Sequence, residues 1–302
     1  MLVVLALGGN ALLRRNEAPE VEVQRANVLT AVARSVAPIA RQHSVVITHG
    51  NGPQIGLLAL QTAAFTQVKP YPLDVLGAES EGMIGYLIEQ ALGEALPDRE
   101  VATLLTQVEV DPADPAFGTP TKPIGPIYGE AEAHALSVRL GFQLARDGGG
   151  FRRVVASPLP RRIRELNTIR ILVAAGVIAI CAGGGGIPVV RTTEGGLRGV
   201  EAVIDKDRSA ALLAEQLGAD ALLLLTDVAA VWTSWPKSAD SRPILRASAK
   251  DLRGYDFAPG SMGPKVEAAC WFVERTGRFA AIGAIEQACA IVEGRAGTVV
   301  RP

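Results

Sequence analysis

Cysteine, histidine, aromatic residues and net charge are all scarce in this sequence. Its 302 residues include three cysteines and three histidines, and Phe, Trp and Tyr make up 5%. Scattered cysteines without a CxxC pair exclude a disulfide framework and do not indicate zinc, so we expect Cys181, Cys270 and Cys289 to be buried small apolar residues. A formal net charge of -1 provides no general attraction to nucleic acid or to an anionic membrane surface. Any anion site must therefore be local.

Long apolar runs are also missing. No run approaches the ~20 residues needed to cross a bilayer, and Met1 leads into an apolar segment with no basic leader before it. We therefore expect a cytoplasmic protein. Hydrophobic residues make up 48% and charged residues 20% of the sequence. This composition is typical of a globular chain with a large core that divides into two lobes.

Short apolar runs recur along the chain, and two of them stop at loops of glycine and asparagine. The first, VVLALGGNAL at Val3 to Leu12, stops at Gly8, and the second, Val45 to Thr48, breaks into HGNG. Runs without polar alternation suit strands that are buried on both faces of a parallel sheet. Loops at the carboxyl ends of such strands form ligand crevices, and glycine lets backbone N–H groups approach an anion. We predict that both loops face one pocket.

The rest of the chain alternates between helical and strand-like segments. Helical periods are expected over 23–40, 54–66, 79–96, 209–217 and 266–276, and strands over 101–108, 177–181, 221–225, 280–282 and near 299. This order predicts an α/β fold with a mostly parallel sheet. Four glycines, Gly183 to Gly186, follow one strand. Because glycine is costly to order, we expect a ligand against their backbone.

Prolines interrupt this pattern between residues 111 and 126. Such a stretch cannot form a helix or a central strand, and we expect an excursion from the sheet. Lys122 lies there between Pro120 and Pro123. Its backbone has little freedom to lose on ordering, so its ammonium group suits contact with a phosphate, although a solvated loop lysine also fits.

Two further lysines are placed like Lys122, in loops bounded by glycine, proline or acidic residues. Lys206 stands between Asp205 and Asp207 at a helix start, and Lys265 follows a glycine-rich loop before another helix. A carboxylate can orient lysines without becoming protonated, although a surface charge cluster with a capping Asp also fits. The loop before Lys265 suits an anion but lacks P-loop spacing. Together the three lysines predict phosphoryl transfer, in which a protein positions groups and neutralises charge.

Seven motifs, in this order, resemble those of carbamate kinases in the amino acid kinase superfamily. They are ALGGNAL at 6–12, THGNGPQIG at 48–56, GTPTKPIGPIY at 118–128, CAGGGGIPV at 181–189, VIDKD at 203–207, LTDV at 225–228 and GSMGPKVEAAC at 260–270. The proline-bounded lysine segment and the GSMGPK loop are typical of carbamate kinases within the superfamily. The resemblance runs nearly from end to end and implies a three-layer αβα sandwich with a protruding lid.

This resemblance also implies an activity and a division of the chain. The activity is Mg-dependent phosphoryl transfer between ATP or ADP and carbamate or carbamoyl phosphate, running toward ATP in a homodimer. Residues 1–200 would form the carbamoyl phosphate lobe, with a lid at about 112–165, and residues 201–302 the nucleotide lobe. No metal ligand from the protein is implied. The sequence does not identify whether breakdown of arginine, agmatine or purines supplies the carbamoyl phosphate, and it does not reveal the physiological direction.

The resemblance implies separate sets of site residues. Substrate binding falls to Gly8, Gly9, Asn10, Gly50, Asn51 and Gly52. Catalysis falls to Lys122, Lys206, Asp207 and Lys265, with Asp207 aligning the lysines. Nucleotide binding falls to Thr226, Asp227, Val228, Trp232, Lys237, Met262, Gly263 and Lys265. The chain departs from the family pattern at Pro236, where glycine is expected, so the role of Lys237 stays open. Trp232 could stack on the adenine ring or pack in the core, and the sequence does not decide between the two.

Other functions remain open from the sequence. A kinase for another small acid, such as acetylglutamate, would share the fold but needs an arginine or a polar set for a second carboxylate, and the first pocket offers mainly Gly, Asn and His49. A catalytically silent nucleotide-binding regulator would keep the fold, but the intact Lys122, Lys206, Asp207 and Lys265 argue against it. A dinucleotide-dependent oxidoreductase is disfavoured because LGGN lacks the GxGxxG spacing.

Overall fold

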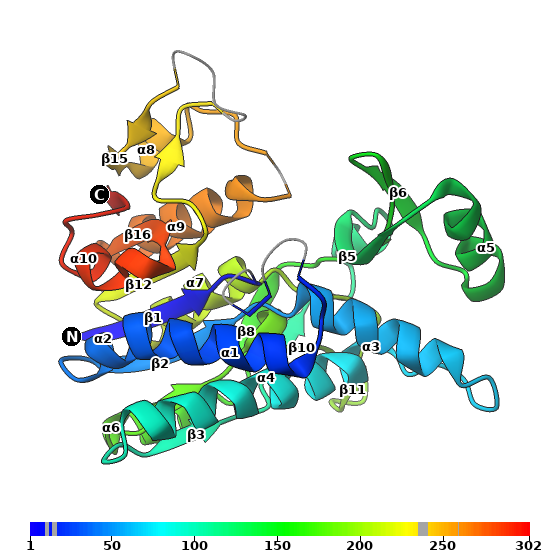
Figure 1. Cartoon of the computed structure of the whole chain (residues 1–302), viewed down its shortest axis with the longest axis horizontal. Coiled ribbons are helices and arrows are strands. Elements are labelled where there is room, and N and C mark those ends of the chain that lie inside the picture. Colours follow the sequence, from blue (N-terminus) through cyan, green and yellow to red (C-terminus); the bar gives the residue numbers. More distant parts are fainter. Residues whose placement is uncertain (10–11, 14–16, 235–240, 259) are drawn as a thin grey trace.

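An eight-stranded sheet forms the centre of the molecule, in the order β15-β17-β16-β12-β1-β2-β9-β3 (Figure 1). The computed structural model describes residues 1–9, 12–13, 17–234, 241–258 and 260–302. The strands are β1 (Leu2–Leu7), β2 (Ser44–His49), β3 (Val101–Thr103), β9 (Ile178–Ile180), β12 (Ala221–Thr226), β15 (Arg246–Ser248), β16 (Phe279–Ala284) and β17 (Thr298–Arg301). Neighbours from β16 to β3 run parallel, whereas β17 is antiparallel to β16 and parallel to β15. The mostly parallel sheet predicted from the sequence is confirmed.

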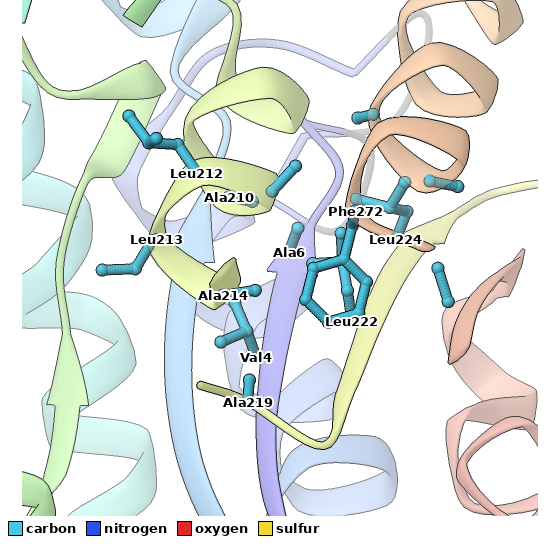
Figure 2. Close-up of a cluster of buried hydrophobic side chains, with 14 of the residues drawn as sticks. Val4, Ala6, Ala210, Leu212, Leu213, Ala214, Ala219, Leu222, Leu224 and Phe272 are labelled. Carbon is cyan, nitrogen blue, oxygen red and sulfur yellow. The ribbon is translucent and has the colours of Figure 1, made fainter. Parts of the chain in front are cut away.

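Strand β1 lies in the middle of this sheet and is buried on both faces. Val3 is in register with Ala221 of β12 on one side and with Val45 of β2 on the other. Val4 and Ala6 face one core, in which side chains from β1, β12, α7 and α9 meet (Figure 2), and the alternate residues of β1 face the other core. Because neither face meets water, the strand needs no polar alternation.

Helices cover both faces of the sheet and complete three layers. One core includes residues of α6 (Leu166–Ala174), α7 (Lys206–Leu217), α8 (Ala249–Leu252) and α9 (Met262–Thr276). The other includes residues of α1 (Val21–Ala31), the π-helical turn η2 (Val32–Val36), α2 (Ala37–Ala40), α4 (Leu73–Ala95) and α10 (Ala288–Val292). This arrangement is the predicted αβα sandwich. None of the described helices is both long and apolar enough to cross a membrane.

Smaller elements lie beside the central sheet. A four-stranded sheet contains β11 (Leu197–Gly199), β10 (Ile187–Arg191), β4 (Gln107–Val110) and β8 (Pro160–Ile163), and a ribbon contains β13 (Val231–Trp232) and β14 (Pro243–Ile244). Short 3-10 turns are η3 (Pro115–Phe117), η4 (Gly183–Gly185) and η5 (Ile285–Gln287). The prediction of one strand over 101–108 is wrong, since β3 and β4 belong to different sheets. The chain turns between them because the N–H of Thr106 donates to a carboxylate oxygen of Glu81 at 2.9 Å.

A separate unit projects from the body and contains β5 (Lys122–Tyr128), α5 (Glu130–Leu140), β6 (Leu144–Asp147) and β7 (Gly150–Val155) (Figure 1). We call this unit the lid. Its strands lie in the order β5-β7-β6, so the proline-rich β5 is an edge strand, where a missing N–H costs no ladder hydrogen bond. The excursion expected at 111–126 therefore leads into β5, which is an edge strand of the lid sheet and not of the central sheet. The lid adjoins α3 (Gly52–Ala64), which starts directly after the loop at the end of β2.

Candidate active site

The loops that follow β1 and β2 meet beside the first turn of α7. The N–H of Gly50 donates to the carbonyl oxygen of Leu7 at 3.0 Å, which fixes the second loop to the end of β1. A Cβ added at Gly50 would lie 3.1 Å from the backbone nitrogen of Gly9 and 3.3 Å from Cδ of Lys206. The structure therefore brings Gly9, Gly50 and Lys206 around one space.

The loop glycines differ in what surrounds them. A Cβ at Gly8 would lie 2.8 Å from the carbonyl oxygen of Leu225, so close strand packing requires glycine there. A Cβ at Gly9 or Gly52 would meet nothing within 4 Å in the described part of the chain. Open space beside these two glycines leaves room for a small anion. Asn10, also predicted here, lies outside the described residues.

Asn51 directs its side chain away from that space. The side chain is buried, and its Nδ2 donates to Oγ of Ser80 on α4 at 2.8 Å. Ser80 in turn donates to the carbonyl oxygen of Gly77 at 2.8 Å. Asn51 therefore holds the second loop on α4, and a substrate contact at this position is left to its backbone.

Asp207 joins two of the predicted lysines at the start of α7. Its Oδ1 accepts from Nζ of Lys206 at 2.5 Å, and its Oδ2 accepts from Nζ of Lys265 at 2.9 Å. The Asp207 side chain is 4% exposed, and those of Lys206 and Lys265 are 13% and 12% exposed. The cluster forms because α7 and α9 pack against one another in the same core.

Burial and mutual attraction set the charges in this cluster. Burial alone would raise the pKa of Asp207, but Lys206 and Lys265 outweigh it and hold that pKa well below its usual value. Burial lowers the pKa of Lys206 to about 8, although Asp207 opposes this shift. Burial also acts to lower the pKa of Lys265, but Asp207 outweighs it and the pKa is raised. At neutral pH, two ammonium groups thus face one carboxylate, and the excess positive charge suits a phosphoryl group.

Lys122 reaches the same helix terminus from the lid. Its Nζ donates to Oδ2 of Asp205 at 2.9 Å. Asp205 is the N-cap of α7, and its Oδ1 accepts from the backbone N–H groups of Asp207 and Arg208 at 3.0 and 3.2 Å. Burial would raise the pKa of Asp205, but Lys122 outweighs it and the pKa is lowered. Asp205 was not predicted as a site residue; the sequence indicated only an acidic neighbour of Lys206 in the VIDKD motif and a possible helix cap.

His49 and Glu81 lie buried on either side of Gly183. A Cβ at Gly183 would lie 2.3 Å from Nε2 of His49 and 2.9 Å from Cγ of Glu81. Nδ1 of His49 lies 3.1 Å from the carbonyl oxygen of Gly50, which can only accept, so Nδ1 carries the proton. Burial lowers the pKa of His49 to about 4 and raises the pKa of Glu81 well above its usual value. His49 is therefore neutral at pH 7 and supports the second loop without adding charge.

The turn Gly183 to Gly186 packs against protein atoms. Gly184 and Gly185 have φ values of +65° and +101°, which favour glycine. A Cβ at Gly184 would lie 2.0 Å from Nδ2 of Asn51, and one at Gly185 would lie 2.5 Å from the carbonyl oxygen of Ile204. These contacts explain the run of glycines without the ligand that the sequence led us to expect.

The residues predicted for the nucleotide lie at the ends of β12 and α9. Thr226 ends β12, Asp227 and Val228 follow it, and Met262 and Gly263 open α9. Trp232 lies in β13, half-buried, in register with Pro243 of β14. Lys237, Trp235 and Pro236 lie outside the described residues.

Comparison with known proteins identifies the family. The sequence pattern of the amino acid kinase family matches residues 1–283. Carbamate kinases of Rhizobium meliloti and Haemophilus influenzae are 54% and 53% identical, over 99% of this chain and 93% and 96% of their own lengths. The chain belongs to the carbamate kinases of the amino acid kinase family. A solved carbamate kinase from Giardia lamblia, bound to AMP-PNP, is 39% identical with a TM-score of 0.90, over 99% of this chain and 98% of that one.

In this carbamate kinase fold, the lid rests on α3 through two glycines. A Cβ added at Gly56 would lie 2.0 Å from Cα and 2.4 Å from the backbone nitrogen of Gly125. Gly125 itself has a φ of +72°. Backbone atoms of α3 and β5 are therefore in direct contact, close in sequence to Lys122.

Replacing Gly56 with alanine is expected to displace the lid. The backbone of Gly125 cannot rotate aside, so β5 must move and carry Lys122 with it. We expect turnover to fall about 10- to 100-fold and the free energy of unfolding to fall by about 1–3 kcal/mol. Steady-state kinetics and denaturant unfolding would measure both effects. Gly82→Ala in α4 is the matched control, because a Cβ there meets nothing within 4 Å; equal activity of both variants would contradict the prediction.

Proposed function

We infer that this protein is a carbamate kinase that transfers a phosphoryl group reversibly between carbamoyl phosphate and ADP. The observation that carries this assignment is the Asp207 cluster, in which Nζ of Lys206 and Nζ of Lys265 lie 2.5 and 2.9 Å from the Asp207 carboxylate and Lys206 lies beside the loop at Gly50. Such a site offers charge and position rather than a nucleophile, as phosphoryl transfer requires. Sequence identity of 54% over nearly the whole chain agrees with it.

The chemistry needs no covalent intermediate with the protein. In the direction of ATP synthesis, the terminal phosphate oxygen of ADP forms a bond to the phosphorus of carbamoyl phosphate while the bond from phosphorus to the carbamate oxygen breaks. Negative charge is redistributed over the transferred phosphoryl and the departing carbamate. Lys206, Lys265 and, from the lid, Lys122 would neutralise this charge, and Asp207 would keep two of these ammonium groups in place.

The glycine loops suit a small substrate. Gly9, Gly50 and Gly52 contribute no side chains to the space, and the side chain of Asn51 turns toward α4. His49 is neutral and buried below the loop. Among the loop residues named here, all of which the structure describes, a second carboxylate, as in acetylglutamate, finds no charged partner. Carbamate, which has a single carboxylate, needs none.

Magnesium would enter with the nucleotide. Among the residues that the structure describes, no group of three or more His, Cys, Asp or Glu side chains is placed to hold a metal ion. Mg²⁺ prefers oxygen ligands and keeps several waters, so phosphate oxygens and water would supply most of its coordination. When bound, it would neutralise part of the phosphate charge. Thr226, Asp227, Val228, Trp232, Met262 and Gly263 remain the proposed nucleotide contacts.

The remaining features of the proposal concern organisation. Residues 1–200 would bind carbamoyl phosphate and residues 201–302 the nucleotide, with the active site between them. The segment at about 112–165, which contains the lid, belongs to the first lobe. The two lobes share one sheet, since β1 pairs with both β2 and β12. A cytoplasmic homodimer that works toward ATP completes the proposal.

The assignment is tested by ATP formation from ADP, Mg²⁺ and carbamoyl phosphate. Acetyl phosphate and acetylglutamyl phosphate are the comparison donors. Rapid turnover with carbamoyl phosphate alone is expected. Turnover confined to acetylglutamyl phosphate would move the assignment to another acid kinase, and ADP binding without turnover on any donor would favour a silent regulator.

A further inference from the structure

A short segment, Glu201 to Asp205, contacts the base of the lid and leads directly into α7. Ala202 forms a parallel bridge with Ala156, which directly follows β7. The N–H of Val203 donates to the carbonyl oxygen of Ala156 at 2.9 Å. The base of the lid is thus tied by backbone contacts to the residues that lead into the active-site helix.

Asp205 ends this segment and uses its two carboxylate oxygens differently. Oδ1 caps α7, whereas Oδ2 accepts from Nζ of Lys122 at 2.9 Å. The side chains of Lys122 and Asp205 are 24% and 17% exposed, so water only partly screens their attraction. Lys122 therefore has a charged partner at the active-site helix.

We propose that Asp205 is a positioning residue that holds the lid lysine Lys122 beside Lys206 and Asp207. The proposal rests on the inferred carbamate kinase activity. Two carboxylates at one helix terminus then position all three lysines. Asp207 positions the two lysines of the body, Lys206 and Lys265, and Asp205 positions the lysine of the lid. A lysine side chain has many rotamers, and a partner that already orders it lowers the cost of ordering it on substrate.

Asparagine at position 205 separates the two roles of the carboxylate. Asparagine is as good a helix cap as aspartate, and its Oδ1 can accept the same two backbone N–H groups. Its Nδ2 would then face Lys122, and a donor cannot accept from an ammonium group. Asp205→Asn therefore removes the partner of Lys122 and leaves α7 capped.

We expect Asp205→Asn to lower kcat/KM for carbamoyl phosphate about 10- to 100-fold with little change in Tm. In a Lys122→Met background the same substitution should cause no further loss, because residues that act through one another are not additive. Glu201→Gln is the matched control. It removes the other ion pair between this segment and the lid, Arg153 to Glu201 at 3.2 Å, without touching Lys122, and it should keep wild-type kinetics.

A second readout does not depend on turnover. Acylation of Lys122 by an amine reagent, followed by mass spectrometry of the ligand-free protein, should be faster in Asp205→Asn than in the wild type and unchanged in Glu201→Gln. This result would stand even if carbamoyl phosphate proved not to be the donor. Unchanged kcat/KM in Asp205→Asn, or tighter substrate binding with faster turnover, would overturn the proposal. If that variant does not fold, Asp205→Ser, which also caps helices, takes its place.

Discussion

Lys206→Met is expected to lower kcat for ATP formation about 100- to 1,000-fold while the protein stays folded. Lys206 is the first residue of α7, and its side chain lies beside the second loop, with Cδ 3.3 Å from a Cβ added at Gly50 and Nζ 2.5 Å from Oδ1 of Asp207. Methionine keeps the length of the side chain and removes its charge. Asp207 would keep Lys265 as its partner at 2.9 Å, so no buried charge is left alone. Initial rates with saturating ADP and carbamoyl phosphate measure the loss.

The same variant separates an enzyme from a nucleotide sensor. Calorimetric titration with MgADP should give an affinity near that of the wild type, because the lysine acts on the transferred phosphoryl. Lys69→Met is the control, since Lys69 is exposed, and it should leave kcat unchanged. Near-normal turnover in Lys206→Met would remove Lys206 from the chemistry, and parallel loss of Tm and kcat would assign the effect to folding.

The outline of the site could be predicted from the sequence because strand ends carry a local signal. The apolar runs that became β1 and β2 stop at glycines, and parallel strands bring their carboxyl ends to one edge of the sheet. Lys122, Lys206 and Lys265 were grouped because each lies in a loop bounded by glycine, proline or acidic residues, and the resemblance added Asp207 as the residue that aligns them. The structure places Lys206 and Lys265 in contact with Asp207.

What the sequence did not predict depends on distant atoms. Gly184 needs glycine because the Asn51 side chain occupies the space that a Cβ would fill, and no local pattern connects the two. Asp205 looked like a helix cap, and its contact with Lys122 depends on how the lid packs. The break between β3 and β4 depends on Glu81 of α4, which binds the N–H of Thr106.

Asp207→Asn should destabilise the protein more than the other substitutions, by about 3–5 kcal/mol at pH 7, and abolish turnover. The substitution leaves two nearly buried ammonium groups, Lys206 and Lys265, without a negative partner. Without Asp207 to oppose burial, the pKa of Lys206 should fall below its wild-type value of about 8, and the pKa of Lys265 should fall below the ordinary lysine value. The folded variant binds fewer protons than its unfolded chain, so its stability should rise with pH. In the wild type, Asp207 raises the pKa of Lys265. The ion pair of these two residues therefore stabilises the folded protein below pH ~10.5, and this stabilisation is lost as the pH rises further. The deficit should therefore shrink between pH 7 and 10, as urea unfolding across this range would show.

A second substitution tests whether unpaired charge is the cause. In the double variant Asp207→Asn with Lys206→Met, one of the two stranded ammonium groups is gone, and a methionine of similar length fills its place. If uncompensated charge destabilises the single variant, the double variant should be more stable than the single one at pH 7. The free energy of unfolding of the double variant should also rise less steeply with pH, because folding releases about one proton fewer. Both variants should remain inactive, because each lacks part of the charge that meets the phosphoryl group. A double variant less stable than Asp207→Asn would mean that Lys206 stabilises the fold through its packing against the second loop, and that Asp207 is needed for reasons other than its charge.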